Sequence, residues 1–159
     1  MFIKPDFNVK SLFDIDIPRL KELGIKAIFF DLDSTVMASK TGIYDEKVYE
    51  WLCGLNEQFK IAILSNNKNP KYIDNIAQQS CFEVIGAANK PSTKVALSHL
   101  EKWGIPPENC VIVGDRPLTD ILLGKRMGAI TVLVDSITCD TEPKIVRFVR
   151  FLERLTIQK

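Results

Sequence analysis

The chain has 159 residues, of which 46% are hydrophobic and 26% are charged, as is ordinary for a globular domain. Its net charge of +1 argues against a surface built to bind nucleic acid. The first 25 residues lack the apolar stretch of a secretory signal, and no apolar run approaches the roughly 18 residues that cross a membrane. We therefore expect a cytoplasmic protein whose membrane contact, if it makes one, is peripheral and on the inner face.

From residue 26 onward, short apolar runs alternate with segments of helical periodicity. The periodicity predicts helices at 45–59, from Asn69 onward, from Ser92 or Thr93 to Gly104, and at 118–127. The apolar runs predict strands at 26–31, 60–66, 82–85, 110–115 and 129–134. This alternation predicts an α/β fold with a five-stranded, mostly parallel sheet covered by helices on both faces.

A single domain accounts for residues 1–159, because no repeat, low-complexity tract or flexible linker interrupts the pattern. It consists of an N-terminal arm (1–25), an α/β core (26–135) and a basic amphipathic C-terminal helix (142–159). One face of that helix carries Ile145, Phe148, Val149, Leu152 and Leu155, and another carries Arg147, Arg150 and Arg154. Two interpretations are open: an interfacial helix beside anionic lipid, or a helix packed on the sheet with a solvated basic face.

Polar residues collect directly after the predicted strands. Each such residue alone is more often a cap or turn former, but ligands of parallel sheets bind beyond the carboxyl ends of the strands. Clustered carboxylates need a cation, and oxygen ligands favour Mg²⁺. A lysine among them suits an anionic substrate. The residues are Asp31 and Asp33 after the first strand, Ser65, Asn66 and Asn67 after the second, Lys90 after the third, and Asp115 and Asp120 after the fourth.

Four motifs resemble those of the haloacid dehalogenase superfamily of phosphotransferases: DLDST (31–35), LSNN (64–67), KP (90–91) and GDRPLTD (114–120). The chain is most similar to the subclass IIIA branch of phosphatidylglycerophosphate phosphatases, whose usual forms are DLDNT and GDQ…TD. It departs from them with Ser34 in place of Asn and Arg116 in place of Gln, and Arg116 adds a cation beside the site. The resemblance implies a Rossmannoid three-layer α/β/α fold.

The resemblance also implies catalytic and metal-binding roles. Asp31 is the nucleophile that forms an aspartyl-phosphate, and Asp33 is the general acid and base. Mg²⁺ is held by the Asp31 carboxylate, the Asp33 backbone carbonyl and Asp115. Residues i and i+2 of an extended segment lie on the same side, so Asp31 and Asp33 are expected to face one phosphate.

The remaining motif residues bind or support the phosphate. Ser65 and the backbone N–H of Asn66 are expected to hold phosphate oxygens, and Lys90 to neutralise the phosphoryl group and the nucleophile. The supporting residues are Thr35, Asn67, Thr119 and Asp120.

The motif spacing leaves no room for a cap domain, so we expect an uncapped (C0) enzyme. Residues 36–64 and 68–89 are each largely used by one helix and one strand. An open site suits a large substrate whose phosphate protrudes.

Three hypotheses about function follow. The first is a phosphatase that converts phosphatidylglycerophosphate to phosphatidylglycerol, an anionic phospholipid substrate that the C-terminal helix would approach at a membrane. The second is a phosphatase for a soluble metabolite or a macromolecular phosphoester. The third, a signalling receiver, is disfavoured because no aspartate follows the third strand in VIGAANKP (84–91). The oligomeric state is left open.

Overall fold

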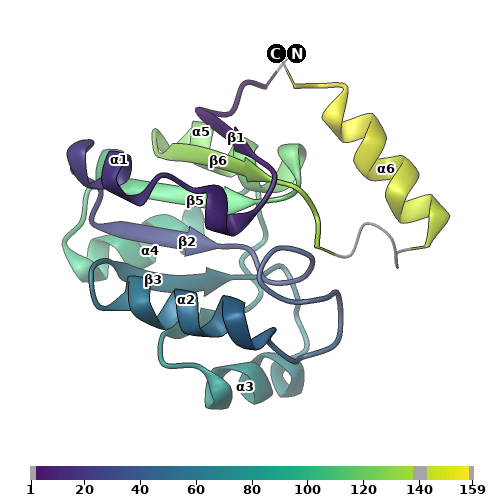
Figure 1. Cartoon of the computed structure of the whole chain (residues 1–159), viewed down its shortest axis with the longest axis horizontal. Coiled ribbons are helices and arrows are strands. Elements are labelled where there is room, and N and C mark those ends of the chain that lie inside the picture. The colour runs from purple at the N-terminus through teal and green to yellow at the C-terminus, as the bar shows by residue number, and fades with distance from the viewer. Residues whose placement is uncertain (1–2, 138–142, 158–159) are drawn as a thin grey trace.

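A computed structural model describes residues 3–137 and 143–157. Its centre is a six-stranded sheet with the order β1-β6-β5-β2-β3-β4, in which every neighbouring pair is parallel (Figure 1). The strands are β1 (Phe7–Val9), β2 (Ala27–Phe30), β3 (Lys60–Leu64), β4 (Glu83–Ile85), β5 (Cys110–Gly114) and β6 (Ile130–Val134).

The helices lie between the strands in chain order. The α-helices are α1 (Ile17–Glu22), α2 (Glu46–Asn56), α3 (Pro70–Gln79), α4 (Lys94–Trp103), α5 (Leu122–Met127) and α6 (Lys144–Arg154). Shorter turns are the 3₁₀ segments η1 (Leu12–Asp14) and η2 (Pro107–Asn109) and the π-helical segment η3 (Pro117–Ile121). The single helix predicted at 118–127 is therefore divided between η3 and α5.

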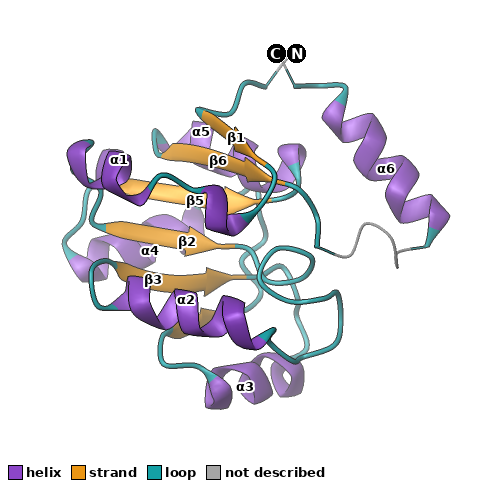
Figure 2. Ribbon diagram, in the orientation of Figure 1, coloured by secondary structure: helices purple, strands orange, loops and turns teal. Residues whose placement is uncertain are grey.

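The sheet is covered on both faces (Figure 2). Alternate residues of β2 point to opposite sides, so Ile28 and Phe30 pack with α1, α2 and α3, while Phe29 packs with α4 and α5. Both faces of the central strands are apolar, as expected for a buried parallel sheet. The predicted three-layer α/β fold is confirmed.

The prediction of five strands was wrong by one. The additional strand, β1, lies in the N-terminal arm and pairs with β6, with Phe7 opposite Val132. Three residues are too few to show an alternating pattern, so the sequence carried no detectable strand signal there.

The connections at the carboxyl edge of the sheet contain no inserted domain. Residues 31–45 between β2 and α2 form a loop with isolated bridges only, and residues 65–69 lead directly from β3 to α3. Both connections lie in the described range. The edge where the motifs lie is therefore not covered by a folded insertion.

Helix α6 lies beyond the carboxyl ends of the strands, at the upper right of Figure 1. Its apolar side chains are exposed, so the interpretation that packs its apolar face on the sheet is wrong. The predicted helix spanned 142–159, of which residues 142, 158 and 159 lie outside the described residues. Among the described residues, no helix is long and apolar enough to cross a membrane.

Asp6 ties the N-terminal arm to the sheet. Its Oδ2 accepts hydrogen bonds from the Thr131 N–H at 2.8 Å, from Thr131 Oγ1 at 2.9 Å and from Lys125 Nζ at 2.9 Å. Partial burial acts to raise the pKa of this carboxyl, but these donors outweigh it and hold the pKa below its usual range.

We expect Asp6→Asn to lower the free energy of unfolding by about 1 kcal/mol at pH 7, a value reduced for solvent screening of this partly exposed group. A depressed folded pKa contributes stability above the unfolded value of about 3.9, and that stability is lost as the pH falls through the folded value. Urea unfolding should therefore show a gap between wild type and variant at pH 7 that narrows at acidic pH. Asp74→Asn, on the exposed side of α3, is the matched control. A gap that stays constant with pH would contradict the ionic role of Asp6.

Candidate active site

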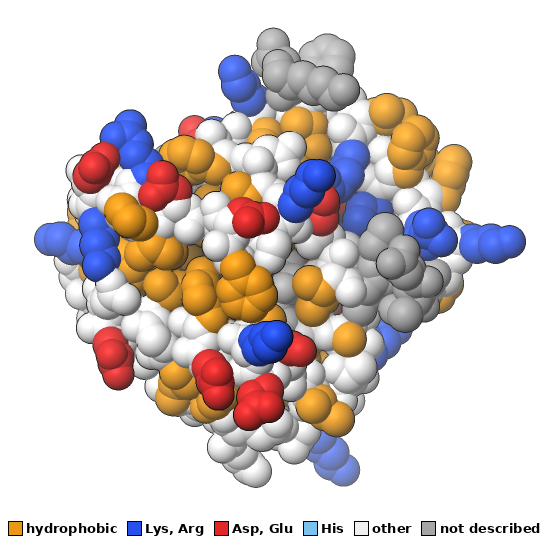
Figure 3. Space-filling view, in the orientation of Figure 1, with side chains coloured by type: hydrophobic (Ala, Val, Ile, Leu, Met, Phe, Trp, Pro, Cys, Tyr) orange, Lys and Arg blue, Asp and Glu red, His pale blue; other side chains and the backbone are white. Residues whose placement is uncertain are grey.

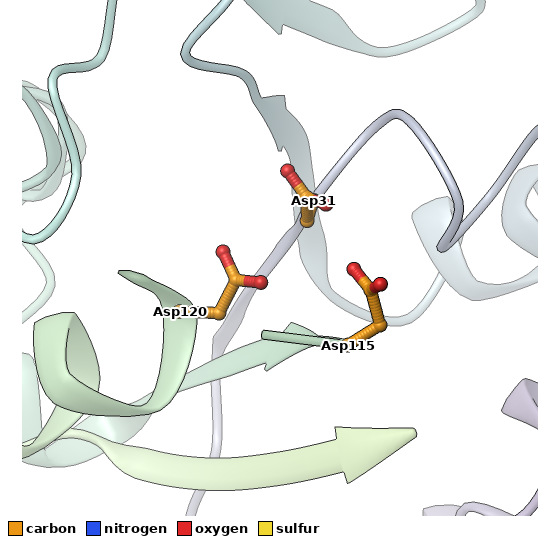
Figure 4. A group of neighbouring side chains, drawn as sticks. All are labelled: Asp31, Asp115 and Asp120. Atoms are coloured by element: carbon orange, nitrogen blue, oxygen red, sulfur yellow. The ribbon is translucent and has the colours of Figure 1, made fainter. Parts of the chain in front are cut away.

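Three aspartates converge at the carboxyl edge of the sheet. Asp31 follows β2, Asp115 follows β5, and Asp120 lies in η3. Each offers a carboxylate oxygen, and these oxygens lie within 4.8 Å of one another (Figure 4). The central position of β2, between β5 and β3, places Asp31 beside both loops that complete the site.

Lys90 joins two of these carboxylates. Its Nζ donates to Asp31 Oδ1 at 2.6 Å and to Asp120 Oδ1 at 2.7 Å, and its side chain is buried. Burial acts to lower the pKa of Lys90, but the charges of Asp120 and Asp31 outweigh it, and the pKa is raised. Lys90 is therefore a fixed positive charge within the cluster.

Backbone and hydroxyl groups hold the carboxylates in place. Thr35 Oγ1 lies 3.0 Å from Asp115 Oδ1 and 3.3 Å from Asp31 Oδ2. The Arg116 N–H donates to Asp120 Oδ2 at 3.2 Å. The Asp120 side chain also lies directly against the backbone of Gly114, where a Cβ would overlap it. Any other residue at Gly114 would push Asp120 out of the cluster.

The cluster is short of positive charge. Burial, and then the charges of Asp31 and Asp120, raise the pKa of Asp115 to about 8, although Arg150 opposes the shift. Burial and Asp31 raise the pKa of Asp120 to about 6, against the effect of Lys90. Asp115 and Asp120 are buried and Asp31 is partly buried, and Lys90 pairs with only two of the three carboxylates. Their oxygen-only donor set fits a hard divalent cation, which would supply the missing charge.

The loop after β3 lies beside Lys90. Ser65 is buried, and its Oγ accepts from the Asn67 N–H at 3.1 Å. The side-chain amide of Asn66 accepts from the Lys90 N–H at 2.6 Å and donates to the Lys90 carbonyl at 3.0 Å. The motif predicted only a backbone role for Asn66, whereas its side chain also holds the backbone of Lys90 at its N–H and its carbonyl.

Asp33 lies apart from the three-carboxylate cluster. Its Oδ1 accepts from the Lys40 N–H and from the Tyr72 hydroxyl, both at 2.8 Å. β2 ends at Phe30, so Asp33 lies in the loop beyond it, where it forms an isolated β-bridge with Met37. That Asp31 and Asp33 face one phosphate stays a prediction.

Thr119 lies next to Asp120 in η3. The Arg116 guanidinium donates to Glu153 of α6 at 2.7 and 3.1 Å, and the hydrogen bond to Glu153, with smaller effects of Asp115 and Asp120, raises the pKa of Arg116. The cation expected beside the site is thus also paired with the C-terminal helix.

Two contacts of the site had no signal in the sequence. Arg150 of α6 lies 2.7 Å from Asp115 Oδ2. Tyr72 of α3 reaches Asp33 from the far side of the loop. The periodicity of each helix shows which residues share a face, but neither predicts which face turns toward the site.

Comparison with known proteins gives clear sequence relatives. The family described as mitochondrial PGP phosphatase matches residues 1–138. The Bacillus subtilis protein named Probable phosphatase YqeG is 33% identical over 154 residues, 96% of this chain and 88% of that protein. Phosphatidylglycerophosphate phosphatase 1, chloroplastic/mitochondrial, of Arabidopsis thaliana is 30% identical over 171 residues, 99% of this chain and 48% of that protein. The chain thus spans about half the length of the plant relative.

Solved structures share the fold. An uncharacterized protein from Listeria monocytogenes serotype 4b aligns with a TM-score of 0.59 at 16% identity, over 75% of this chain and 85% of that one. A predicted HAD-like family hydrolase from Porphyromonas gingivalis aligns with a TM-score of 0.58 at 14% identity, over 81% and 98%. At these identities the likeness concerns the fold alone.

We expect Lys90→Met to lower the free energy of unfolding by about 3 kcal/mol, because removing one partner of a buried ion pair leaves charge uncompensated. The double variant Lys90→Met/Asp120→Asn should regain part of that loss, since one orphaned carboxylate is removed with the lysine. Urea unfolding of wild type, both single variants and the double variant at pH 7.5 measures the coupling. Simple additivity of the two single losses would contradict a direct interaction.

Proposed function

Because the chain belongs to the mitochondrial PGP phosphatase family, a branch of the haloacid dehalogenase phosphatases, we propose that it is a Mg²⁺-dependent phosphomonoesterase acting on phosphatidylglycerophosphate. The family predicted from the four motifs is thereby confirmed. The observation that carries the proposed chemistry is the cluster of Asp31, Asp115 and Asp120, bridged by the buried Lys90 at the carboxyl edge of the sheet.

The proposed reaction has two steps, and Asp31 and Asp33 act in both. An Asp31 carboxylate oxygen attacks phosphorus, the ester P–O bond breaks, and Asp33 gives its proton to the departing alcohol oxygen. Water then attacks the aspartyl-phosphate and gives a proton to Asp33, and the bond from phosphorus to Asp31 breaks to release phosphate. Asp33 reaches the substrate in this scheme by leaving its contact with Tyr72.

Positive charge and hydrogen-bond donors stabilise the transferring phosphoryl group. Lys90 offsets charge on Asp31 and on the phosphoryl oxygens, and Ser65 and the Asn66 N–H lie on the adjacent loop as phosphate ligands. Mg²⁺, held by Asp31, Asp115 and the Asp33 carbonyl, with Asp120 nearby, would screen the nucleophile and the phosphate.

A lipid phosphate is the substrate that we favour. The plant relative is named for phosphatidylglycerophosphate, and no folded insertion covers the described part of the site. A cavity of about 810 Å³ also flanks α6, which suits an anionic headgroup with an apolar chain. It is lined by Lys144, Arg147, Arg150 and Arg154, by Phe148 and Phe151, and by Asp135 and Ser136. We propose that the protein meets its substrate peripherally at a membrane, through α6.

We expect Asp31→Asn to lower kcat by more than about 10⁴-fold, as loss of a covalent nucleophile typically does. Mg²⁺-dependent release of phosphate from phosphatidylglycerophosphate measures the effect, with circular dichroism to verify the fold. Asp74→Asn, on the exposed side of α3, is the control and should keep wild-type turnover. Turnover by Asp31→Asn close to the wild-type rate would remove the aspartyl-phosphate mechanism.

We expect kcat/KM to be higher for phosphatidylglycerophosphate in mixed micelles than for glycerol 3-phosphate, sugar phosphates or nucleotides, because only the lipid engages both the site and α6. A clear preference for a soluble ester would refute the lipid assignment and favour the alternative, a phosphatase of soluble metabolites. The phosphatase chemistry itself would stand in that case.

A further inference from the structure

Helix α6 directs charged side chains toward the domain and apolar side chains toward solvent. Its residues shielded from solvent are charged: Glu153 is buried, and Arg150 and Arg154 are partly buried. Their spacing of three and four places them on one face. The apolar residues instead face outward, with Ile145 72% exposed and Phe148 58% exposed. The other exposed apolar residues of the segment are Val146, Val149, Phe151, Leu152 and Leu155.

The inward face of α6 is attached to the active-site edge by ion pairs. Arg154 reaches Asp135 at 3.0 Å, and Glu153 pairs with Arg116 at 2.7 Å. Arg150 contacts Asp115 Oδ2 at 2.7 Å, and that carboxylate is fully buried. Since Thr35 bonds the other Asp115 oxygen, both oxygens of this carboxylate are engaged while α6 is docked.

Arg150 therefore supplies positive charge at the carboxylate that a metal ion would use. The cluster needs positive charge at Asp115, because the oxygens of Asp31, Asp115 and Asp120 lie within 4.8 Å of one another and Lys90 pairs only with Asp31 and Asp120. A guanidinium and a metal ion at the same carboxylate compete for its charge and its space. Docking of α6 and metal binding are thus opposed.

The energetics favour release of α6 at an apolar surface. The pairs of Arg116 with Glu153 and of Arg154 with Asp135 are partly exposed and therefore screened by solvent, whereas the Arg150–Asp115 pair is buried and costs more to break unless another cation replaces Arg150. Moving an exposed Phe or Leu side chain from water to an apolar medium is favourable, in proportion to the apolar area removed from water. Seven apolar side chains are exposed on this segment, so their transfer to a bilayer opposes the loss of the ion pairs, and a metal ion at Asp115 would replace the charge of Arg150.

An anionic phospholipid bilayer is the partner that fits this surface. Hydrophobic and basic side chains lie together over α6 at the right of Figure 3. The segment 143–157 has four basic residues and one acidic residue, which suits an anionic interface. A second copy of the chain would bring two helices of the same net charge together, which is unfavourable.

We propose that α6 is a membrane-responsive latch on the cation site. Away from lipid, Arg150 holds Asp115; at an anionic bilayer the apolar face inserts, Arg150 leaves Asp115, and the carboxylate becomes available to a metal ion. This proposal rests on the proposed function only in assuming a divalent cation at Asp115. Linkage then requires that lipid and metal strengthen each other's binding.

The test measures binding of Mn²⁺, a spectroscopic substitute for Mg²⁺, by electron paramagnetic resonance on the full chain. Without lipid, Arg150→Gln should bind Mn²⁺ at least about fivefold more tightly than wild type, at the lower end of typical coupling between sites. Arg147→Gln removes the same charge from the same helix without the Asp115 contact and should bind as wild type does. Equal or weaker Mn²⁺ binding by Arg150→Gln would overturn the latch.

The second arm adds vesicles. Vesicles of phosphatidylcholine with phosphatidylglycerol should tighten Mn²⁺ binding by wild type and leave Arg150→Gln nearly unchanged, whereas phosphatidylcholine alone should have little effect. Ile145→Ser/Phe148→Ser should lose vesicle co-sedimentation and the Mn²⁺ response together. No effect of anionic vesicles on wild type, or a dimer that α6 mediates in place of vesicle binding, would overturn the proposal.

Neither experiment measures turnover, so the latch and the proposed substrate can be refuted independently of each other. If Mn²⁺ binding and vesicle binding are coupled but phosphatidylglycerophosphate is not hydrolysed, the latch stands and the substrate assignment falls. If hydrolysis is found without the coupling, the latch falls alone.

Discussion

The structure depends on a compact cluster of charged side chains, largely shielded from solvent, at the carboxyl edge of the sheet. Removing each ion from water costs several kcal/mol even after relaxation, so three carboxylates persist there only with compensation. Lys90 supplies part of it by bridging Asp31 and Asp120, and Arg150 supplies another part from α6. The remaining deficit appears as the raised pKa of Asp115. A divalent cation at the three carboxylates would supply the missing positive charge.

The fold provides this arrangement through strand order and close backbone packing. With β2 between β5 and β3, the loops after three adjacent strands meet at one point. Asp120 fits because Gly114 has no side chain, and Lys90 enters from a backbone that Asn66 holds at both its N–H and its carbonyl. The catalytic candidates are therefore positioned by the rigid part of the domain. Tyr72 and Lys40 hold Asp33 in a loop, where movement costs less.

Most of the fold and much of the candidate site could be predicted from the sequence, because buried parallel strands are apolar runs that end in polar residues. That pattern located β2 to β6 and put Asp31, Lys90, Asp115 and Asp120 on one edge. It could not locate β1, whose three residues carry no period. The contact of Asp33 with Tyr72 also escaped it, since Tyr72 lies on α3 and the strand pattern does not predict how that helix is oriented.

The orientation of α6 was the hardest feature to predict, and its cause lies in the site itself. A hydrophobic stripe on a helix normally turns inward because burial of apolar area dominates folding. Here the surface that α6 meets is anionic, with Asp115 and Asp135 as its contacts, and it selects the arginine face. The excess negative charge that favours a metal ion at the cluster thus also orients α6 with its arginines toward the site. The apolar face is left outward, so the electrostatics of the active site determine which surface the protein offers to its surroundings.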